Sequence, residues 1–421
     1  MGLKDLVVRN EVFEEIDPAP KLGSILDAMQ TGKAHDLNTK LLANPKDFFK
    51  RTFITPNMLS LLEKVVEGFE GGKKVFVLYS FYGGGKTHTL LALIHAFRNP
   101  EILADPEVIK DVDTETRARL EQLVERIKNV KASIVAFSGD SSKYSGSPIS
   151  PTNVGNYAYR TVWGYLAHCL GKYYDFRESD EKIVAPQQDV IERLLEGERA
   201  LFVFDELSDY LKDFTGGEYR EYAQAVANFV EYFVQAVRKS KSVAVITLPV
   251  DISGKADWRY EGDKIVQSLW DSLKGLAEPI EPLRSGDIDI VNVLRKRLFE
   301  DIPESVRERT VQKFKEKLIN YPEYFGSQDY AEEVISYYPF SPEYIKLLQT
   351  LILRTGMQKT RDALIISMKV LREMLSSGED AELIMPWHIN LSLFERAFLA
   401  GLSDYRHVSV SYTHLRAHET E

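Results

Sequence analysis

The feature that most constrains this chain is a run of three glycines between an apolar segment and a helical pattern, within residues 75–91 (VFVLYSFYGGGKTHTLL). Because glycine has no Cβ, Gly83, Gly84 and Gly85 allow a tight turn whose backbone N–H groups converge on one place. The helix that follows would present the positive end of its dipole there. This pattern predicts a loop that binds the phosphates of a nucleoside triphosphate.

Side chains beside the glycines complete the expected phosphate site. Lys86 is placed to reach the β and γ phosphates, and the Thr87 hydroxyl is placed to ligate Mg²⁺. The spacing follows G-x-x-x-x-G-K-[ST] with one departure, because Ser80 stands where the first glycine is expected. We expect this small residue to be accommodated. The residues predicted to contact the nucleotide are Ser80, Tyr82, Gly83, Gly84, Gly85, Lys86, Thr87 and His88.

An acidic pair follows a second apolar run, in residues 200–207 (ALFVFDEL). A strand here would deliver Asp205 and Glu206 to the carboxyl end of the sheet, where open α/β sheets bind their ligands. We expect Asp205 to hold Mg²⁺ through its water shell and Glu206 to polarise the water that attacks the γ-phosphorus. Such a motif is common by chance, so the prediction depends on its position downstream of Lys86.

Three further residues are candidates for sensing the γ-phosphate. Thr247 ends the fourth predicted strand and could orient the attacking water, although threonine also simply favours strands. Arg259 lies between the fourth and fifth predicted strands and could serve a neighbouring subunit as an arginine finger, or be an ordinary loop arginine. Arg361 opens a predicted helix and could reach back to the γ-phosphate. Arg295, in the run LRKRLF, is expected to be structural.

Strand and helix patterns alternate up to about residue 286, which predicts an α/β fold of the P-loop type with a parallel five-stranded sheet sandwiched by helices. The predicted strands are 75–79, 133–137, 200–204, 242–247 and 277–283. Beyond residue 287 the strand signals stop, which predicts an all-helical lid. Its helices are predicted at 287–300, 304–319, 342–355 and 361–375.

The last residues have a different origin from the rest. The segment VSYTHLRAHET reverse-translates to a transposon-end adapter used in sequencing libraries, so we interpret it as an artefact and expect the natural chain to be longer. His414 and His418 have the spacing of two zinc ligands on a helix, but an adapter has no selected chemistry. The predicted parts are a helical extension (1–72), a core (73–286) with insertions at about 100–130 and 138–198, a lid (287–409) and this artefact (410–421).

Composition limits the partners of the chain. Its 421 residues carry a formal net charge of −10 at pH 7, which argues against a broad nucleic-acid groove while leaving room for a local basic patch. The longest apolar runs are far short of the roughly 18 residues of a membrane span, and the N-terminus lacks a signal-peptide layout, so we expect a cytoplasmic protein without a membrane partner. Cys169 is the only cysteine, which excludes an intramolecular disulfide.

Seven motifs, together with the order of the predicted elements, carry a resemblance to known proteins. The assembly resembles the AAA+ superfamily of P-loop ATPases. More narrowly, it resembles a prokaryotic ATPase family known only as a domain of unknown function, whose members occur beside DNA methylases and helicases in phage-defence islands. Ser80 and Cys169 depart from the residues common in that family. The motifs are FFKRTFIT (48–55), YGGGKTHTLLAL (82–93), RTVWGYLAHCLG (160–171), VFDELSDYL (203–211), RKRLF (295–299), YPFSPE (338–343) and QKTRDAL (358–364).

Three functions fit these expectations. The first is an Mg²⁺-dependent AAA+ ATPase that binds and hydrolyses ATP to remodel or regulate protein partners in a DNA-associated defence complex, as a monomer or a homo-oligomer, with turnover that a partner could stimulate. The second is a nucleotide-gated switch or scaffold that binds ATP with negligible hydrolysis. The third is an origin-recognition-like DNA-binding ATPase. It would need a basic winged-helix domain, which is not recognisable in this sequence.

Overall fold

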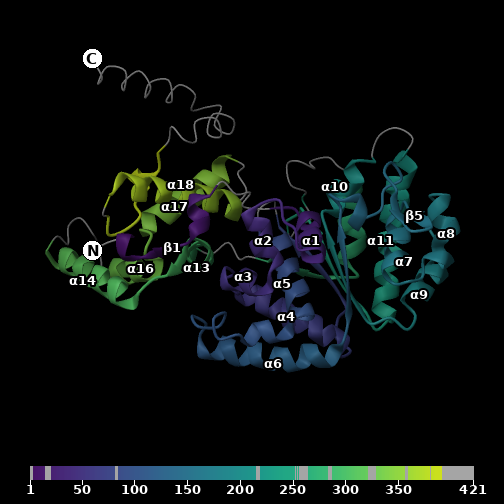
Figure 1. Cartoon of the computed structure of the whole chain (residues 1–421), viewed down its shortest axis with the longest axis horizontal. Coiled ribbons are helices and arrows are strands. Elements are labelled where there is room, and N and C mark those ends of the chain that lie inside the picture. The colour runs from purple at the N-terminus through teal and green to yellow at the C-terminus, as the bar shows by residue number, and fades with distance from the viewer. Residues whose placement is uncertain are drawn as a thin grey trace, which may run out of the picture. The chain divides into compact units, whose positions relative to one another are not determined.

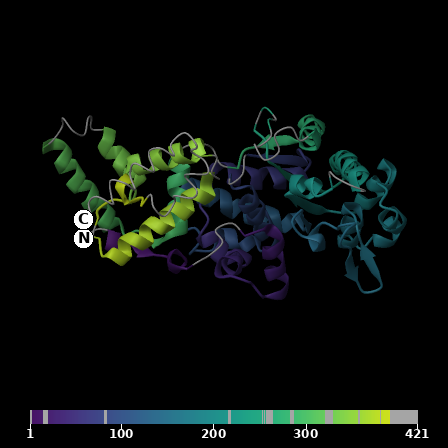
Figure 2. The same ribbon diagram turned by 90° about the horizontal axis from the view of Figure 1, so that it is seen from above.

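The chain forms two compact units, which we describe separately (Figure 1, Figure 2). One unit is Ala19–Arg284, and the other combines Met1–Pro18 with Ser285–Glu421. The predicted extension 1–72 is therefore divided between the two units. The computed structural model describes residues 3–14, 20–80, 84–214, 219–251, 253, 255, 264–282, 287–320, 329–355, 359–379 and 381–390.

A five-stranded sheet forms the centre of the unit 19–284. Its strand order is β3-β6-β7-β2-β8, and every neighbouring pair is parallel. The predicted α/β fold with a parallel five-stranded sheet is confirmed. Strand β7 lies between β2 and β6, so the strand before the glycine-rich loop and the strand that ends in Asp205 both border it. The strands are β2 (Val75–Tyr79), β3 (Ser133–Ser138), β6 (Ala200–Asp205), β7 (Val243–Leu248) and β8 (Glu278–Ile280).

Helices cover both faces of this sheet. Helix α5 contacts β3, β6 and β7, and helix α11 contacts β2 and β7. Figure 1 shows α4, α5 and α6 on one side of the strands and α10 and α11 on the other. Because both faces are covered, every residue of β6 and β7 is buried. These helices and their neighbour α12 are α4 (Pro56–Phe69), α5 (Lys86–Arg98), α6 (Thr114–Val130), α10 (Leu207–Lys212), α11 (Arg220–Lys239) and α12 (Lys264–Lys274).

The start of α4 follows its sequence signals closely. The Thr55 hydroxyl accepts a hydrogen bond from the N–H of Met58 at 3.1 Å, and proline occupies the first helical turn. The side-chain amide of Asn57 donates to the carbonyl of Glu281 at 2.7 Å. The helix that leads into β2 is thereby attached at its start to the residues that follow β8.

Smaller elements complete this unit before β2, between α5 and α6, and between β3 and β6. The hairpin β4-β5 and helices α7, α8 and α9 lie together at one side of it (Figure 1, Figure 2). The sequence patterns predicted a polar loop where β4 forms. The remaining elements are α1 (Leu22–Thr31), α2 (Leu37–Ala43), α3 (Pro45–Lys50), η3 (Pro100–Ala104), η4 (Ser142–Tyr144), β4 (Thr152–Val154), β5 (Tyr157–Tyr159), α7 (Val162–Cys169), α8 (Tyr173–Glu181) and α9 (Gln188–Leu195).

A buried carboxylate organises the turn into α7. Asp180 is fully buried and accepts hydrogen bonds from the N–H groups of Arg160 at 3.0 Å and Thr161 at 2.9 Å. The Tyr173 hydroxyl donates to it at 3.0 Å. A Cβ at Gly164 would lie 2.0 Å from Oδ1 of Asp180, so only glycine fits there. Arg160, Thr161 and Gly164, which belong to the motif 160–171, therefore have structural contacts with this carboxylate.

The second unit is mostly helical and has its own hydrophobic core. The prediction of an all-helical lid is wrong in one respect, because strand β9 pairs antiparallel with β1 near the start of the chain. Arg295 has a structural position, since its guanidinium donates to the carbonyls of Tyr338 at 2.5 Å and Ser336 at 2.6 Å. The elements are η1 (Leu3–Asp5), β1 (Val7–Val8), η2 (Asn10–Phe13), α13 (Asp287–Leu298), β9 (Phe299–Asp301), α14 (Glu304–Asn320), α16 (Asp329–Tyr337), α17 (Pro342–Thr355), α18 (Lys359–Ser377) and η7 (Pro386–His388).

Candidate functional site

The glycine-rich loop joins the end of β2 to the start of α5. Gly85 has a φ of +78°, a left-handed conformation that a side chain would disfavour, and α5 begins at the next residue. The N–H of Ser80 donates to the carbonyl of Leu248 at the end of β7, at 3.5 Å. Tyr82 and Gly83 lie outside the described residues, so their predicted contacts stay predictions.

Lys86 lies close to the residue that opens the loop. Its ammonium group donates to the backbone carbonyl of Ser80 at 2.6 Å and lies 3.4 Å from the Ser80 hydroxyl. The shorter contact uses the backbone, which glycine would also provide. This contact therefore does not depend on which residue stands at position 80.

The ends of β6 and β7 place Asp205 beside two threonines. Asp205 is only 2% exposed, and its Oδ1 accepts a hydrogen bond from the Thr247 hydroxyl at 2.7 Å. Thr87, from the first turn of α5, lies close enough for its hydroxyl to lower the pKa of this carboxyl group. The structure therefore brings Lys86, Thr87, Asp205 and Thr247 together, although 161 positions separate Lys86 from Thr247.

The second oxygen of Asp205 is a candidate cation ligand. Oδ2 is buried and has no hydrogen-bond partner among the described residues. Burying a carboxylate oxygen without a partner costs free energy. Together with the Thr87 hydroxyl, this oxygen forms the kind of hard oxygen donor set that Mg²⁺ prefers. Across the described ranges no group of three or more His, Cys, Asp or Glu residues could hold a metal ion. The residues fit an ion that keeps several waters and binds phosphate oxygens, which is usual for Mg²⁺.

Opposing effects act on the pKa of Asp205. Burial raises this pKa above its ordinary value, and the charge of Asp140 adds to the rise. Hydrogen bonds from Thr87 and Thr247 and the charge of Lys86 oppose the rise only in part. The hydrogen bonds and the lysine stabilise the charged carboxylate form. A cation at Oδ2 would act in the same direction.

Glu206 has an unusual backbone conformation and a raised pKa. Its φ of +54° places it in the left-handed region, at the turn between β6 and α10. Burial raises the pKa of Glu206 to about 8, with further increases from the charges of Asp205, Asp140 and Asp209. The charge of Lys21 lowers it. Proton exchange near neutral pH is thus within reach of this side chain.

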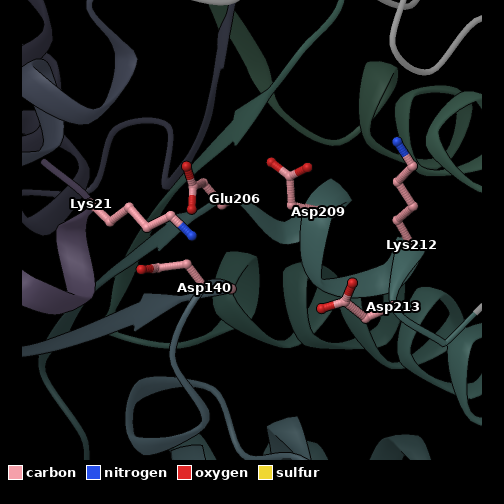
Figure 3. Close-up of a pocket in the computed structure, with 7 residues that line it drawn as sticks. Lys21, Asp140, Glu206, Asp209, Lys212 and Asp213 are labelled. Carbon is pink, nitrogen blue, oxygen red and sulfur yellow. The ribbon is translucent and has the colours of Figure 1, made fainter. Parts of the chain in front are cut away.

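Glu206 borders a cavity of about 320 Å³ (Figure 3). Figure 3 shows Lys21 pointing into this cavity toward Glu206 and Asp140. Carboxylates outnumber lysines in the lining, so the cavity is acidic overall. It is lined by Lys21, Gly139, Asp140, Glu206, Asp209, Lys212 and Asp213.

The turn after β3 packs directly on the backbone of Glu206. The N–H of Gly139 donates to the carbonyl of Asp205 at 3.0 Å. A Cβ at Gly139 would lie only 2.1 Å from the carbonyl oxygen of Glu206. Glycine is therefore required at position 139 for this close approach.

His88, Arg361 and Arg259 were also predicted to belong to the site. His88 points toward the motif 48–55, where its Nε2 lies 2.8 Å from the Thr52 hydroxyl and its ring centroid lies 4.5 Å from that of Phe48. Its predicted nucleotide contact stays a prediction. Arg361 belongs to the other unit, and Arg259 lies outside the described residues. Their proposed contacts with the γ-phosphate also stay predictions.

The sequence reasoning missed Lys21, Asp140 and Asp209. Asp140 could have been found, because it follows a predicted strand and carboxyl ends of parallel strands meet at one edge of the sheet. Asp209 could have been placed near Glu206 by the helix that starts at residue 207. Lys21 carries no comparable signal, since it stands before a short helix far from the other residues in sequence.

Comparisons with known proteins identify a family for the chain. Residues 1–278 match the DUF499 N-terminal domain, and residues 285–409 match the DUF499 second domain. No curated protein and no solved structure matches. In the part of the chain that the structure describes, no helix has the length and apolar character needed to cross a membrane. The artefact predicted at 410–421 lies outside both matches and outside the described residues. Because the two matches cover nearly the whole sequence, the chain belongs to the DUF499 family.

Proposed function

We propose that this protein is an AAA+-type ATPase that binds ATP with Mg²⁺ and hydrolyses it. The observation that carries the proposal is the meeting of three groups at the carboxyl edge of the sheet: the Lys86 ammonium, the Thr87 hydroxyl and the unpaired oxygen of Asp205. Glu206 follows Asp205 directly in the chain and borders the neighbouring cavity. Their residue types and order along the chain match the parts of a P-loop hydrolase.

The strand order supports the AAA+ assignment. Strand β7 lies between the strand before the loop and the strand that ends in Asp205. This position brings Thr247 to a place between the two motifs, with its hydroxyl 2.7 Å from Asp205. A polar side chain there is suited to orient a water molecule while keeping the carboxylate in place.

Each residue has a defined task in the proposed reaction. Lys86 would bind the β and γ phosphates, and Thr87 and Asp205 would hold Mg²⁺, which would supply positive charge against the phosphates. Glu206 accepts a proton from the attacking water. As the water oxygen bonds to the γ-phosphorus, the bond from phosphorus to the β,γ-bridging oxygen breaks and ADP leaves with that electron pair.

The partner on which ATP hydrolysis would act is proposed from the sequence motifs. Because these motifs resemble a family found beside DNA methylases and helicases, we propose that hydrolysis regulates a DNA-associated protein complex. Purification of the tagged, uninterrupted natural protein from its own host, with identification of co-purifying proteins, tests this. Recovery without methylase or helicase partners at physiological salt would contradict the assignment.

Two variants test the hydrolysis. Glu206→Gln is expected to bind ATP as tightly as the wild type while its phosphate release falls at least 100-fold, a typical contribution of a general base. Lys86→Ala is expected to lose binding of ATP. Bound nucleotide is measured by equilibrium titration and phosphate release by a coupled assay, with Lys33→Ala, at an exposed position after α1, as the control.

The same measurements separate the two main classes of function. Tight ATP binding by the wild type with no phosphate release would replace the ATPase proposal with a nucleotide-gated switch. Equal turnover of the wild type and Glu206→Gln would remove Glu206 from its assigned role.

A further inference from the structure

Glu206 stands among carboxylates on several elements. The charges of Asp205 on β6, Asp140 in the turn after β3 and Asp209 on α10 all act on it. Asp213 also lines the cavity that Glu206 borders. Because like charges repel, the Glu206 carboxylate would be pushed away from these neighbours unless a cation lies beside it.

Lys21 is the cation that points at Glu206. Figure 3 shows its ammonium group directed toward the carboxyl groups of Glu206 and Asp140. Lys212, the other lysine in the cavity lining, points away from Glu206. Lys86 acts on Asp205, on the phosphate-loop side of the site.

The backbone that carries Lys21 is held against the turn after β3. Lys21 immediately precedes α1, and an ideal Cβ at Gly23 would lie 2.8 Å from the Ser141 Cβ and 3.3 Å from an oxygen of Asp140. Farther along the helix, Asp27 forms an ion pair with Lys143 and accepts a hydrogen bond from Tyr144 at 3.0 Å. These contacts fix the start of α1 beside the cavity, while the Lys21 side chain itself is exposed.

We propose that Lys21 is a positioning residue that holds the Glu206 carboxylate in place against the repulsion of its acidic neighbours. Its effect on turnover rests on the proposed function, but its attraction for Glu206 needs no nucleotide. The inference therefore adds a residue from the N-terminal part of the unit to a site otherwise built from the sheet edge.

The first experiment measures turnover. Lys21→Met is expected to lower kcat for ATP about tenfold, a fraction of what a general base contributes, with KM changed less than twofold. Lys21→Arg is expected to restore most of kcat because it keeps the charge. Lys212→Met removes a charge from the same cavity and is expected to change kcat less than twofold. Equal losses of kcat in Lys21→Met and Lys212→Met would overturn the positioning role of Lys21.

The second experiment needs no hydrolysis. Thermal unfolding is measured without nucleotide for Lys21→Met, Glu206→Gln and the double variant, at pH 9, where Glu206 with its pKa of about 8 is charged. A parallel cycle uses Lys212→Met in place of Lys21→Met. Lys21→Met is expected to lower Tm more in the wild type than in Glu206→Gln, whereas Lys212→Met is expected to lower it equally in both. Equal shifts for Lys21→Met in the two backgrounds would overturn the inference. A wild type that shows this coupling but releases no phosphate would contradict the proposed hydrolysis alone.

Discussion

The hydroxyl of Thr247 donates a 2.7 Å hydrogen bond to Oδ1 of Asp205, joining the carboxyl ends of β7 and β6. Both side chains are 2% exposed, so water cannot easily replace the bond. The contact leaves Oδ2 of Asp205 as the oxygen available to a cation. Thr247 therefore orients the carboxylate, whatever its part in sensing the γ-phosphate.

Thr247→Val tests this orientation with nearly the same side-chain volume. We expect a loss of about 1–3 kcal/mol in the free energy of unfolding, because a buried carboxylate oxygen loses its donor. Thr247→Ser keeps the hydroxyl and should lose less. Urea denaturation of the three proteins provides the comparison, and indistinguishable Val and Ser variants would show that the bond contributes little.

Gly139→Ala should disturb the backbone at Glu206, because the new Cβ would lie 2.1 Å from its carbonyl oxygen. We expect a destabilisation of about 1–3 kcal/mol together with reduced ATP turnover. Gly275→Ala is the matched control, since an added Cβ there meets no atom within 4 Å. Chemical denaturation and phosphate release measure the two effects. A Gly139→Ala protein as stable as the control would refute the steric argument.

Asp180→Ala should be strongly destabilising. The substitution removes the acceptor for two backbone N–H groups and the Tyr173 hydroxyl in a fully buried place. We expect a cost of about 3 kcal/mol or more. Asp189→Ala is the control, because its side chain is 70% exposed and pairs with Arg193 on its own helix at 3.5 Å, so its cost should be below about 0.5 kcal/mol. Denaturation curves that coincide for the two variants would contradict this role of Asp180.

The buried side chain of His95 should make the stability of the protein depend on pH. Burial lowers its pKa from 6.5 to about 4, and Nε2 contacts the carbonyl of Leu42 at 2.8 Å. Between pH 4 and 6.5 the unfolded chain binds more protons at His95 than the folded chain does. The contribution of His95 to the free energy of unfolding is therefore complete above pH 6.5 and is lost as the pH falls toward 4.

The size of that loss is about 3 kcal/mol at most. His95→Gln should therefore remove part of the decrease in unfolding free energy between pH 6.5 and 4. Chemical denaturation across this range, on the wild type and the variant, measures the difference. Parallel pH profiles would show that His95 does not titrate in the expected way.

Removal of Mg²⁺ should abolish ATP turnover and weaken ATP binding, since Thr87 and the unpaired oxygen of Asp205 are its proposed ligands. The shift in Tm caused by ATP should shrink when EDTA is added, because a ligand stabilises a protein in proportion to its binding free energy. Asp205→Asn should show the smaller shift even with Mg²⁺ present. An ATP-dependent Tm shift that is insensitive to EDTA would contradict the assigned cation site.

Local signals in the sequence were reliable where one element carries its own pattern. The strand at 75–79 and the helix after Thr55 and Pro56 form as predicted, because apolar runs and capping residues act within a few positions. Strands β1 and β9 were missed because each is too short for a periodic pattern. Their pairing joins residues 7–8 to residues 299–301, which no local window contains.

The sequence alone predicted the glycine-rich loop between a strand and a helix, the acidic pair at the end of the third predicted strand and the parallel α/β class, because these depend on residue type, spacing and burial pattern. Only the tertiary structure decided that β7 lies between β2 and β6, that Thr247 holds Asp205, and that Lys21 points at Glu206. The physical reason is that strand order and side-chain approach depend on contacts between segments far apart in the chain, whereas local propensity and periodicity do not encode them.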